Sequence, residues 1–273
     1  MKKALLIGID YHNDNRLKLF GCINDITLMS GMLMDALDYR KQDITMIRDD
    51  SNKSHLKPIK ENILRELNNI VNEDLEEIWI HYSGHGTYRL DDDGDERDNK
   101  DEVIVPIDYK SHGIISDDMM MDIIKKSKTK TIITFDCCNS ASLFDLPWRF
   151  EYTNGRFNKY VENNDNIENK NIIMFSACRD NQLAVDGYDN ERRMSVGGMT
   201  PALIDTLRHN RYNVAVFKLF KDMCTYQKIK NREQITTLSS SSEFPEITFT
   251  RPLIMKKNNT AYSKEIFNKD YFR

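Results

Sequence analysis

The sequence predicts an α/β protein with a mostly parallel central sheet and helices on both of its faces. Short apolar runs rich in β-branched residues alternate along the chain with segments whose apolar residues recur at helical spacing. This alternation is typical of parallel β-α units, in which function lies at the carboxyl ends of the strands. Because 40% of the 273 residues are hydrophobic, one ordinary packed core is expected, and we predict a single domain.

Two β-α units open the chain. Residues 4–10 form an apolar run that predicts a strand, and residues 24–37 follow with apolar positions spaced as on one face of a helix. Residues 44–48 predict a second strand. Residues 57–71 predict a second helix, with a proline in its first turn, where the missing backbone N–H costs nothing.

Residues 131–140 (TIITFDCCNS) predict a buried strand that ends in an active-site turn. Side chains alternate between the two faces of a strand, so Asp136 and Cys138 share one side and Cys137 faces the other. Cys138 is then the exposed thiol and Cys137 the packed one. A lone cysteine is more often a small core residue than a nucleophile, so the interpretation needs a partner for Cys138.

Residues 77–86 (EIWIHYSGHG) repeat this design with histidines. The run delivers His81, Ser83 and His85 at alternate positions, with a glycine on each side of His85. His85 precedes Cys138 by about fifty residues, which is the caspase-type spacing between a histidine base and a cysteine nucleophile. Either residue alone would more often have a structural role, but the pair indicates a Cys138–His85 dyad.

Residues 91–102 (DDDGDERDNKDE) hold eight carboxylates, a density that repels itself unless water or a cation intervenes. The segment is either a solvated loop or a cation site. It does not match an EF-hand, because placing Gly94 at the sixth loop position would require acids at Arg89 and Lys100.

Residues 103–109 predict a short strand. Ser116 then matches a helix N-cap, with Asp117 and Asp118 in the first turn of a helix that extends through Lys126. A role as helix-start acids would by itself explain both aspartates.

The second half of the chain contains further elements. Residues 149–170 are rich in Asn and charge and predict an exposed linker, which would be a natural nicking site. Residues 171–177 predict another buried strand, residues 199–208 and 214–227 two helices, and residues 246–250 an edge strand.

Composition excludes several classes of protein. The net charge of −4 and the lack of a basic stripe argue against nucleic acid as a partner. The first apolar run is too short for a signal peptide, and no run approaches the length of a membrane span. Five cysteines without a C-x-x-C spacing predict a reducing compartment, so we expect a soluble, cytoplasmic protein without an organic cofactor.

The motifs, taken in order, resemble those of the metacaspases of the caspase-like cysteine peptidase clan, type I-like and without the N-terminal prodomain. The resemblance covers nearly the whole chain and includes ALLIGIDY, LFGCINDI, HYSGHG, DEVIVPID, ISDDMM, DCCNSASLFDLP, FSACRDNQLAVD and GGMTPALIDTLR. It implies a caspase-like α/β/α sandwich. The implied parts are a large-subunit-like part over residues 1–148, the linker over 149–170, a small-subunit-like part over 171–255 and a tail over 256–273.

The resemblance implies roles for individual residues. His85 would be the general base and Cys138 the nucleophile, and the backbone N–H groups of Gly86 and Cys138 would bind the oxyanion. Asp25, Ser83 and Asp136 match positions that line the primary specificity pocket. Two carboxylates there suit Arg or Lys at the cleaved position, so the expected partners are basic protein or peptide substrates.

The resemblance also implies calcium as an activator. Asp101, Asp117, Asp118 and Asp145 match positions through which many metacaspases bind calcium, and hard carboxylate oxygens are the ligands that calcium prefers. Metacaspase resemblance further favours a monomer over the dimer of the caspases.

Two departures from the family pattern leave alternatives open. Asn139 follows the reactive cysteine in place of histidine, and Ala141 replaces a glycine, which could restrict the turn that presents Cys138. A catalytically silent regulatory or scaffold protein is therefore the main alternative. A calcium-binding module without peptidase chemistry is a third reading, favoured only by residues 91–102, and it leaves both strand-end motifs unexplained.

Overall fold

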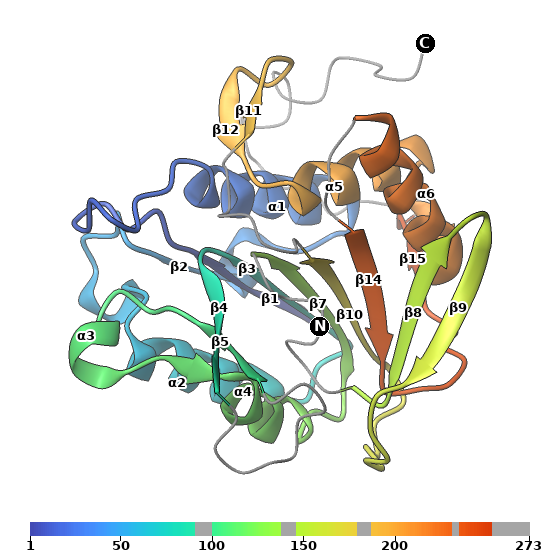
Figure 1. Cartoon of the computed structure of the whole chain (residues 1–273), viewed down its shortest axis with the longest axis horizontal. Helices are drawn as coiled ribbons and strands as arrows, with labels where there is room; N and C mark the ends of the chain where they lie inside the picture. Colours follow the sequence, from blue (N-terminus) through green and yellow to red (C-terminus); the bar gives the residue numbers. More distant parts are fainter. Residues whose placement is uncertain (91–99, 138–145, 179–186, 231–234, 253–273) are drawn as a thin grey trace.

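A computed structural model describes residues 1–90, 100–137, 146–178, 187–230 and 235–252. Its centre is an eight-stranded sheet in the order β2-β1-β3-β7-β10-β14-β8-β9 (Figure 1). The first five strands in that order are mutually parallel, and the last three pair antiparallel. The strands are β1 (Lys2–Gly8), β2 (Ile44–Arg48), β3 (Glu77–Ser83), β7 (Lys130–Asp136), β8 (Trp148–Thr153), β9 (Arg156–Val161), β10 (Ile172–Cys178) and β14 (Ile235–Ser240).

Helices cover both faces of this sheet, as the layered view in Figure 1 shows. Helices α1 (Cys22–Ala36), α5 (Met199–His209) and α6 (Val216–Ile229) pack on one face. Helices α2 (Lys60–Val71) and α4 (Asp117–Ile124) pack on the other, near the short α3 (Tyr109–His112). Alternate side chains of one strand enter the two layers, so that Trp79 lies in the first core and Ile78 and Ile80 lie in the second. The predicted α/β/α architecture is confirmed.

Three small sheets accompany the central one. Strands β4 (Gly86–Leu90), β5 (Lys100–Ile104) and β6 (Ile115–Ser116) form the first, the hairpin of β11 (Gly187–Asp189) and β12 (Met194–Val196) the second, and β13 (Asn213–Ala215) with β15 (Thr248–Thr250) the third. Two 3₁₀ turns, η1 (Lys41–Asp43) and η2 (Ser54–Leu56), flank β2.

The prediction of an exposed linker over residues 149–170 is wrong for most of its length. Strands β8 and β9 form a hairpin there that extends the central sheet. Only one face of the hairpin is apolar: Phe150 packs edge-on against Phe217 of α6, and most β9 side chains are exposed. The exposed polar positions therefore hid the strand alternation in the sequence.

One further boundary differs from the prediction, and one strand was not predicted. The strand predicted over residues 103–109 ends at Ile104, because Pro106 cannot continue the ladder, and Tyr109 already begins α3. The serine- and threonine-rich segment before residue 242 is β14, which pairs with β10 and β8 and whose hydroxyl side chains are buried.

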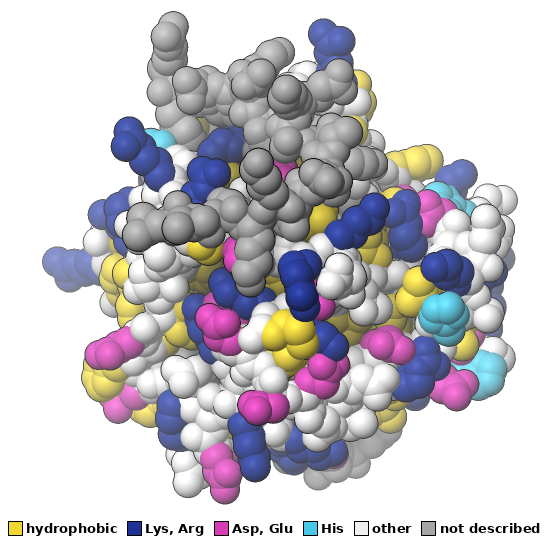
Figure 2. Space-filling model, turned by 180° about the vertical axis from the view of Figure 1, so that it is seen from behind, with side chains coloured by type: hydrophobic (Ala, Val, Ile, Leu, Met, Phe, Trp, Pro, Cys, Tyr) yellow, Lys and Arg dark blue, Asp and Glu magenta, His cyan; other side chains and the backbone are white. Residues whose placement is uncertain are grey.

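Surface charge is mixed. On the face shown in Figure 2, the described basic and acidic side chains are interspersed. A protein that binds nucleic acid would instead gather its basic side chains into a stripe. Among the described residues, no helix combines the length and apolar character that crossing a membrane requires.

Candidate active site

The two strands that carry the motifs are neighbours in the sheet. β3 and β7 pair in parallel with Ser83 opposite Asp136, so both end at the same edge. Cys137 follows at once and is 3% exposed, in the core between the sheet and helices α2 and α4. The prediction that Cys137 packs inward is confirmed, whereas Cys138 lies outside the described residues.

His85 follows the end of β3 and is half-buried. Its Nε2 lies 2.7 Å from the main-chain oxygen of Leu17, and its ring contacts that of Tyr11 with centroids 4.9 Å apart. A carbonyl can only accept, so Nε2 carries the proton and donates it to Leu17. Nδ1 is then the nitrogen with a lone pair, which is the tautomer that a general base requires.

Two buried tyrosines hold the main chain of His85. The His85 N–H donates to Tyr11 Oη at 3.1 Å, and Tyr82 Oη donates to the His85 carbonyl oxygen at 2.7 Å. Tyr11 Oη in turn donates to the Val105 carbonyl at 2.6 Å. Burial raises the pKa of Tyr11, so its phenol stays protonated and keeps this donor. Neither tyrosine was singled out from the sequence, although both fall within motifs of the resemblance.

Gly84 is explained by the same arrangement. A Cβ built on Gly84 would lie about 2.5 Å from Tyr82 Oη, closer than any ordinary contact. The glycine therefore lets the chain turn over the tyrosine that holds His85. Gly86, the predicted oxyanion donor, begins β4 one residue after His85 and is opposite Ile104 of β5.

Asp25, Ser83 and Asp136, which were predicted to line the specificity pocket, lie together at this edge. Ser83 Oγ donates to Asp25 Oδ2 at 2.7 Å, and Ser83 neighbours Asp136 across the strands. All three are buried, Asp25 completely. The Gly197 N–H donates to both Asp25 oxygens, at 3.0 and 3.1 Å.

Asp136 caps helix α5 from a distant part of the chain. Its carboxylate accepts from the N–H groups of Gly198, Met199 and Thr200 at 2.7–3.1 Å, and from Thr200 Oγ1 at 2.8 Å. These are the donors that a helix N-terminus leaves unsatisfied, and a negative charge is favourable there. A Cβ on Gly197 would collide with this carboxylate, so the close approach requires glycine.

The β11–β12 hairpin brings Gly197 and Gly198 to this position. The side chain of Arg192, in the hairpin turn, is 6% exposed and forms ion pairs with Asp189 at 2.6 Å and with Asp205 of α5 at 2.5 Å. Burial alone would lower the pKa of Arg192, but the two carboxylates raise it above its usual value. Tyr226 Oη of α6 also donates to Asp205, at 2.9 Å. This buried ion-pair cluster, unpredicted from the sequence, fixes the hairpin to the helices.

His81 lies deeper on β3 and is completely buried. Its Nδ1 is 2.8 Å from Thr134 Oγ1, while Nε2 has no hydrogen-bond partner among the described residues. Burial lowers the pKa of His81 to about 4, although the charge of Asp136 acts in the opposite direction. His81 is therefore a neutral core residue.

Of the predicted calcium ligands, Asp117 and Asp118 are described with their side chains. Ser116 Oγ accepts from the Met119 N–H at 3.3 Å, which confirms the predicted N-cap, and Asp118 N–H donates to Asp117 Oδ1 at 2.9 Å. The side chains of Asp101 and Asp145 lie outside the described residues.

Glu102 is a carboxylate that sequence reasoning did not assign as a ligand. The β5–β6 pairing joins Val103 to Ser116, so Glu102 and Asp117 flank the same pair, and both are buried. Hard carboxylate donors of this kind fit calcium. Among the described residues, however, no group of three His, Cys, Asp or Glu could hold a metal ion.

Comparisons with known proteins all indicate one family. A family model described as metacaspase, peptidase C14 domain, matches residues 2–147. Metacaspase-1A of Neurospora crassa is 41% identical over 152 residues, which cover 54% of this chain and 33% of that protein. Metacaspase-1B of the same organism is 30% identical over 256 residues, which cover 76% of this chain and 59% of that protein. The aligned part thus spans 33–59% of the length of these two relatives.

Solved structures give the same fold. Protein GSU0716 from Geobacter sulfurreducens superposes with a TM-score of 0.62 at 16% identity, covering 94% of this chain and 99% of that one. The structure of pro-Sf-caspase-1 superposes with a TM-score of 0.56 at 12% identity, covering 91% and 94%. At this identity the likeness concerns the fold, which is caspase-like.

Proposed function

This chain belongs to the metacaspase family of cysteine peptidases, and from that premise we propose that it is an endopeptidase using a Cys138–His85 dyad. The observation that carries the proposal is the hydrogen bond from His85 Nε2 to the Leu17 carbonyl, which leaves Nδ1 as the basic nitrogen. Cys138 comes two residues after β7, next to the strand that His85 follows.

In the proposed mechanism, His85 Nδ1 takes the proton of the Cys138 thiol, and the thiolate attacks the substrate carbonyl. The N–H groups of Gly86 and Cys138 stabilise the oxyanion. The protonated His85 then gives its proton to the leaving amine, and water, activated by the same histidine, hydrolyses the thioester. The two tyrosines that hold the His85 main chain keep the ring in place through these steps.

We propose specificity for Arg or Lys at the cleaved position. Asp25 and Asp136 support this, since they are two buried carboxylates at the edge where the dyad would act. A guanidinium or ammonium group is the complementary partner for such a pair, whereas an acidic side chain would be repelled. In the described conformation Asp25 is completely buried and accepts from Ser83 Oγ and the Gly197 N–H, so this edge must open for a basic side chain to reach it.

We also propose that calcium activates the enzyme through Asp101, Asp117, Asp118 and Asp145. The support is the burial of Asp117 beside Glu102 and the hard oxygen chemistry of these donors. Calcium would tie the acidic segment to the chain that follows Cys138 and so order the turn that presents the thiol. Its role would be structural, because Cys138 and His85 suffice for the chemistry.

The proposed state is a monomer in a reducing, cytoplasmic environment. Strand β9 closes one end of the sheet and carries the exposed cations Arg156 and Lys159, which oppose edge-to-edge pairing. No disulfide joins the described cysteines Cys22, Cys137 and Cys224. Light scattering of the purified chain tests the monomer, and a mass of twice the 32.0 kDa of one chain would refute it.

One assay tests the catalytic proposal. The purified chain is incubated with Arg-, Lys- and Asp-terminated fluorogenic peptides, in calcium and in excess chelator. We expect hydrolysis of the basic peptides only, stimulated by calcium, and none by Cys138→Ala or His85→Ala, with Cys137→Ala as the active control. A folded chain that cleaves nothing would favour the silent regulatory alternative, and cleavage after Asp would refute the pocket assignment.

A further inference from the structure

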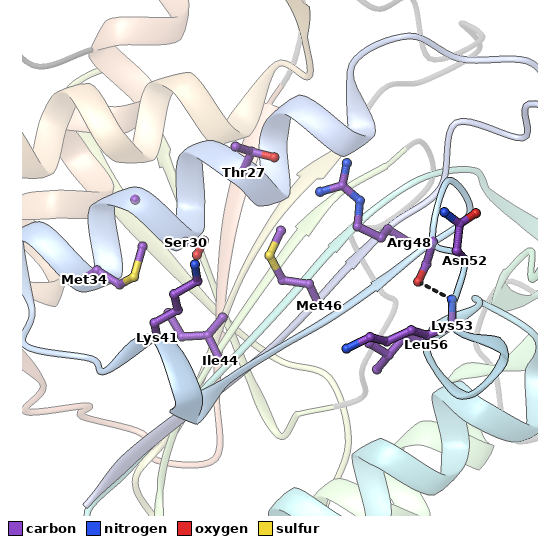
Figure 3. Close-up of a pocket in the computed structure, with 12 residues that line it drawn as sticks. Thr27, Ser30, Met34, Lys41, Ile44, Met46, Arg48, Asn52, Lys53 and Leu56 are labelled. Atoms are coloured by element: carbon purple, nitrogen blue, oxygen red, sulfur yellow. Dashed lines mark hydrogen bonds between the residues drawn. The ribbon is translucent and has the colours of Figure 1, made fainter. Parts of the chain in front are cut away.

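A pocket of about 600 Å³ lies away from the proposed dyad, between helix α1 and the edge strand β2 (Figure 3). Side chains of α1 form one wall, and those of β2 and the segment that follows it form the other. Small-molecule sites in proteins commonly have volumes of about 300–1,000 Å³. The pocket is therefore large enough for a small organic ligand.

The pocket has an apolar lining. Ile44, Met46 and Arg48 alternate along β2, and the first two face the layer of α1 and are only partly buried. They remain partly open because β2 is the last strand of the sheet. Met34 of α1 and Leu56 of η2 complete the apolar part. Methionine is flexible and polarisable, so this lining can adapt to the shape of a ligand.

The charged residues of the pocket are all cations. Lys41, Arg48 and Lys53 line it together with hydroxyl and amide side chains, and none of the described residues that line it is acidic. Arg48 pairs with Asp50, but Lys41 and Lys53 form no ion pair with any described residue. The chain as a whole carries a net charge of −4, so a pocket whose charged lining side chains are cations favours an anion.

Gly31 gives independent support. It lies inside α1 and lines the pocket, where a glycine destabilises a helix by about 1 kcal/mol relative to alanine. Nothing in the described structure lies within 4 Å of a Cβ built at this position, so packing does not require glycine. A larger side chain would instead project into the pocket. Keeping the pocket open is a physical reason for this residue.

We propose that the pocket binds a small organic anion with an apolar body and a carboxylate or phosphate head group. The apolar body would contact Met34, Met46 and Leu56, and the head group would lie near Lys41 at one end of the pocket or Lys53 at the other (Figure 3). This site is separate from the proposed dyad, and its test does not depend on peptidase activity.

The test measures binding of laurate and dodecyl phosphate to the full chain by calorimetry and by the shift in melting temperature. Dodecyltrimethylammonium serves as the cationic probe with the same apolar chain. We expect at least one anion to bind and raise the melting temperature, as a ligand of the native state must, and the cation to bind at least tenfold more weakly. The stronger of the two anions identifies the head group.

Three variants locate the site. Gly31→Leu should weaken anion binding at least tenfold while melting no lower than the unmodified chain, and Gly31→Ala gives a milder version should the larger residue disturb folding. Lys41→Glu/Lys53→Glu should also weaken binding at least tenfold. Lys126→Glu/Lys128→Glu changes the charge equally on exposed residues near the end of α4 and should bind like the unmodified chain. Equal binding of the cation, or full anion binding by Gly31→Leu, would overturn the proposal.

Discussion

Replacing Asp136 with alanine tests whether this carboxylate holds the fold together as well as facing substrate. The change removes the acceptor of three main-chain N–H groups and one hydroxyl at the start of α5. Loss of an N-cap costs about 1 kcal/mol. Leaving two of the remaining buried donors without a partner adds about 2 kcal/mol at the low end of the usual range.

The free energy of unfolding should therefore fall by about 3 kcal/mol, which corresponds to a melting temperature lower by roughly 6–12 °C in a chain of this size. Thermal and urea unfolding of Asp136→Ala measure this directly. Thr200→Val is the matched control, because it removes only the hydroxyl donor and should cost about 1 kcal/mol. A variant that melts with the unmodified chain but has lost activity would refute the capping role and leave Asp136 as a residue for substrate alone.

Three further predictions follow from the geometry. Tyr11→Phe keeps the ring contact with His85 but removes the oxygen that accepts the His85 N–H, so kcat should fall about tenfold, as for loss of about 1.4 kcal/mol, with little change in KM. The pKa of His81 is lower in the folded chain than the ordinary 6.5, so stability should fall by about 3 kcal/mol as the pH drops from 6.5 to about 4. Arg192→Met leaves the half-buried Asp189 without its cation and the buried Asp205 with Arg208 as its only described cation, at 3.7 Å, so it should destabilise the chain by about 3 kcal/mol, at the low end of the range for a broken buried ion pair, and raise KM for basic peptides.

Each of these has a control and a contrary result. An unchanged kcat in Tyr11→Phe would show that Tyr82 alone holds His85. The loss of stability between pH 6.5 and about 4 should be smaller in His81→Gln. The same loss of stability in that variant would assign the pH dependence to other groups. Arg193→Met, at the exposed neighbouring position, should leave stability and KM unaltered. Equal effects of the two arginine changes would refute the proposal that the ion pairs of Arg192 fix the hairpin to the helices.

The local elements could be predicted from the amino-acid sequence, because they depend on the spacing of apolar residues and on caps within a few positions. The parallel strands at 44–48 and 77–83, the helix at α2 and the Ser116 N-cap were predicted in this way and are confirmed. The inward side of Cys137 followed from strand alternation alone. The family was predicted from the motifs and from their order along the chain.

Contacts between residues far apart in the chain could be seen only in the tertiary structure. Asp136 finds its partners 62–64 positions later, and His85 donates to a carbonyl 68 positions earlier, so no local pattern could have indicated either contact. Strand β14 is polar in sequence, yet its hydroxyl side chains are buried, and Thr237 Oγ1 forms a hydrogen bond with Ser176 Oγ of β10. A hydrogen bond of that kind removes the cost of burying a polar group, but only the assembled sheet supplies the partner.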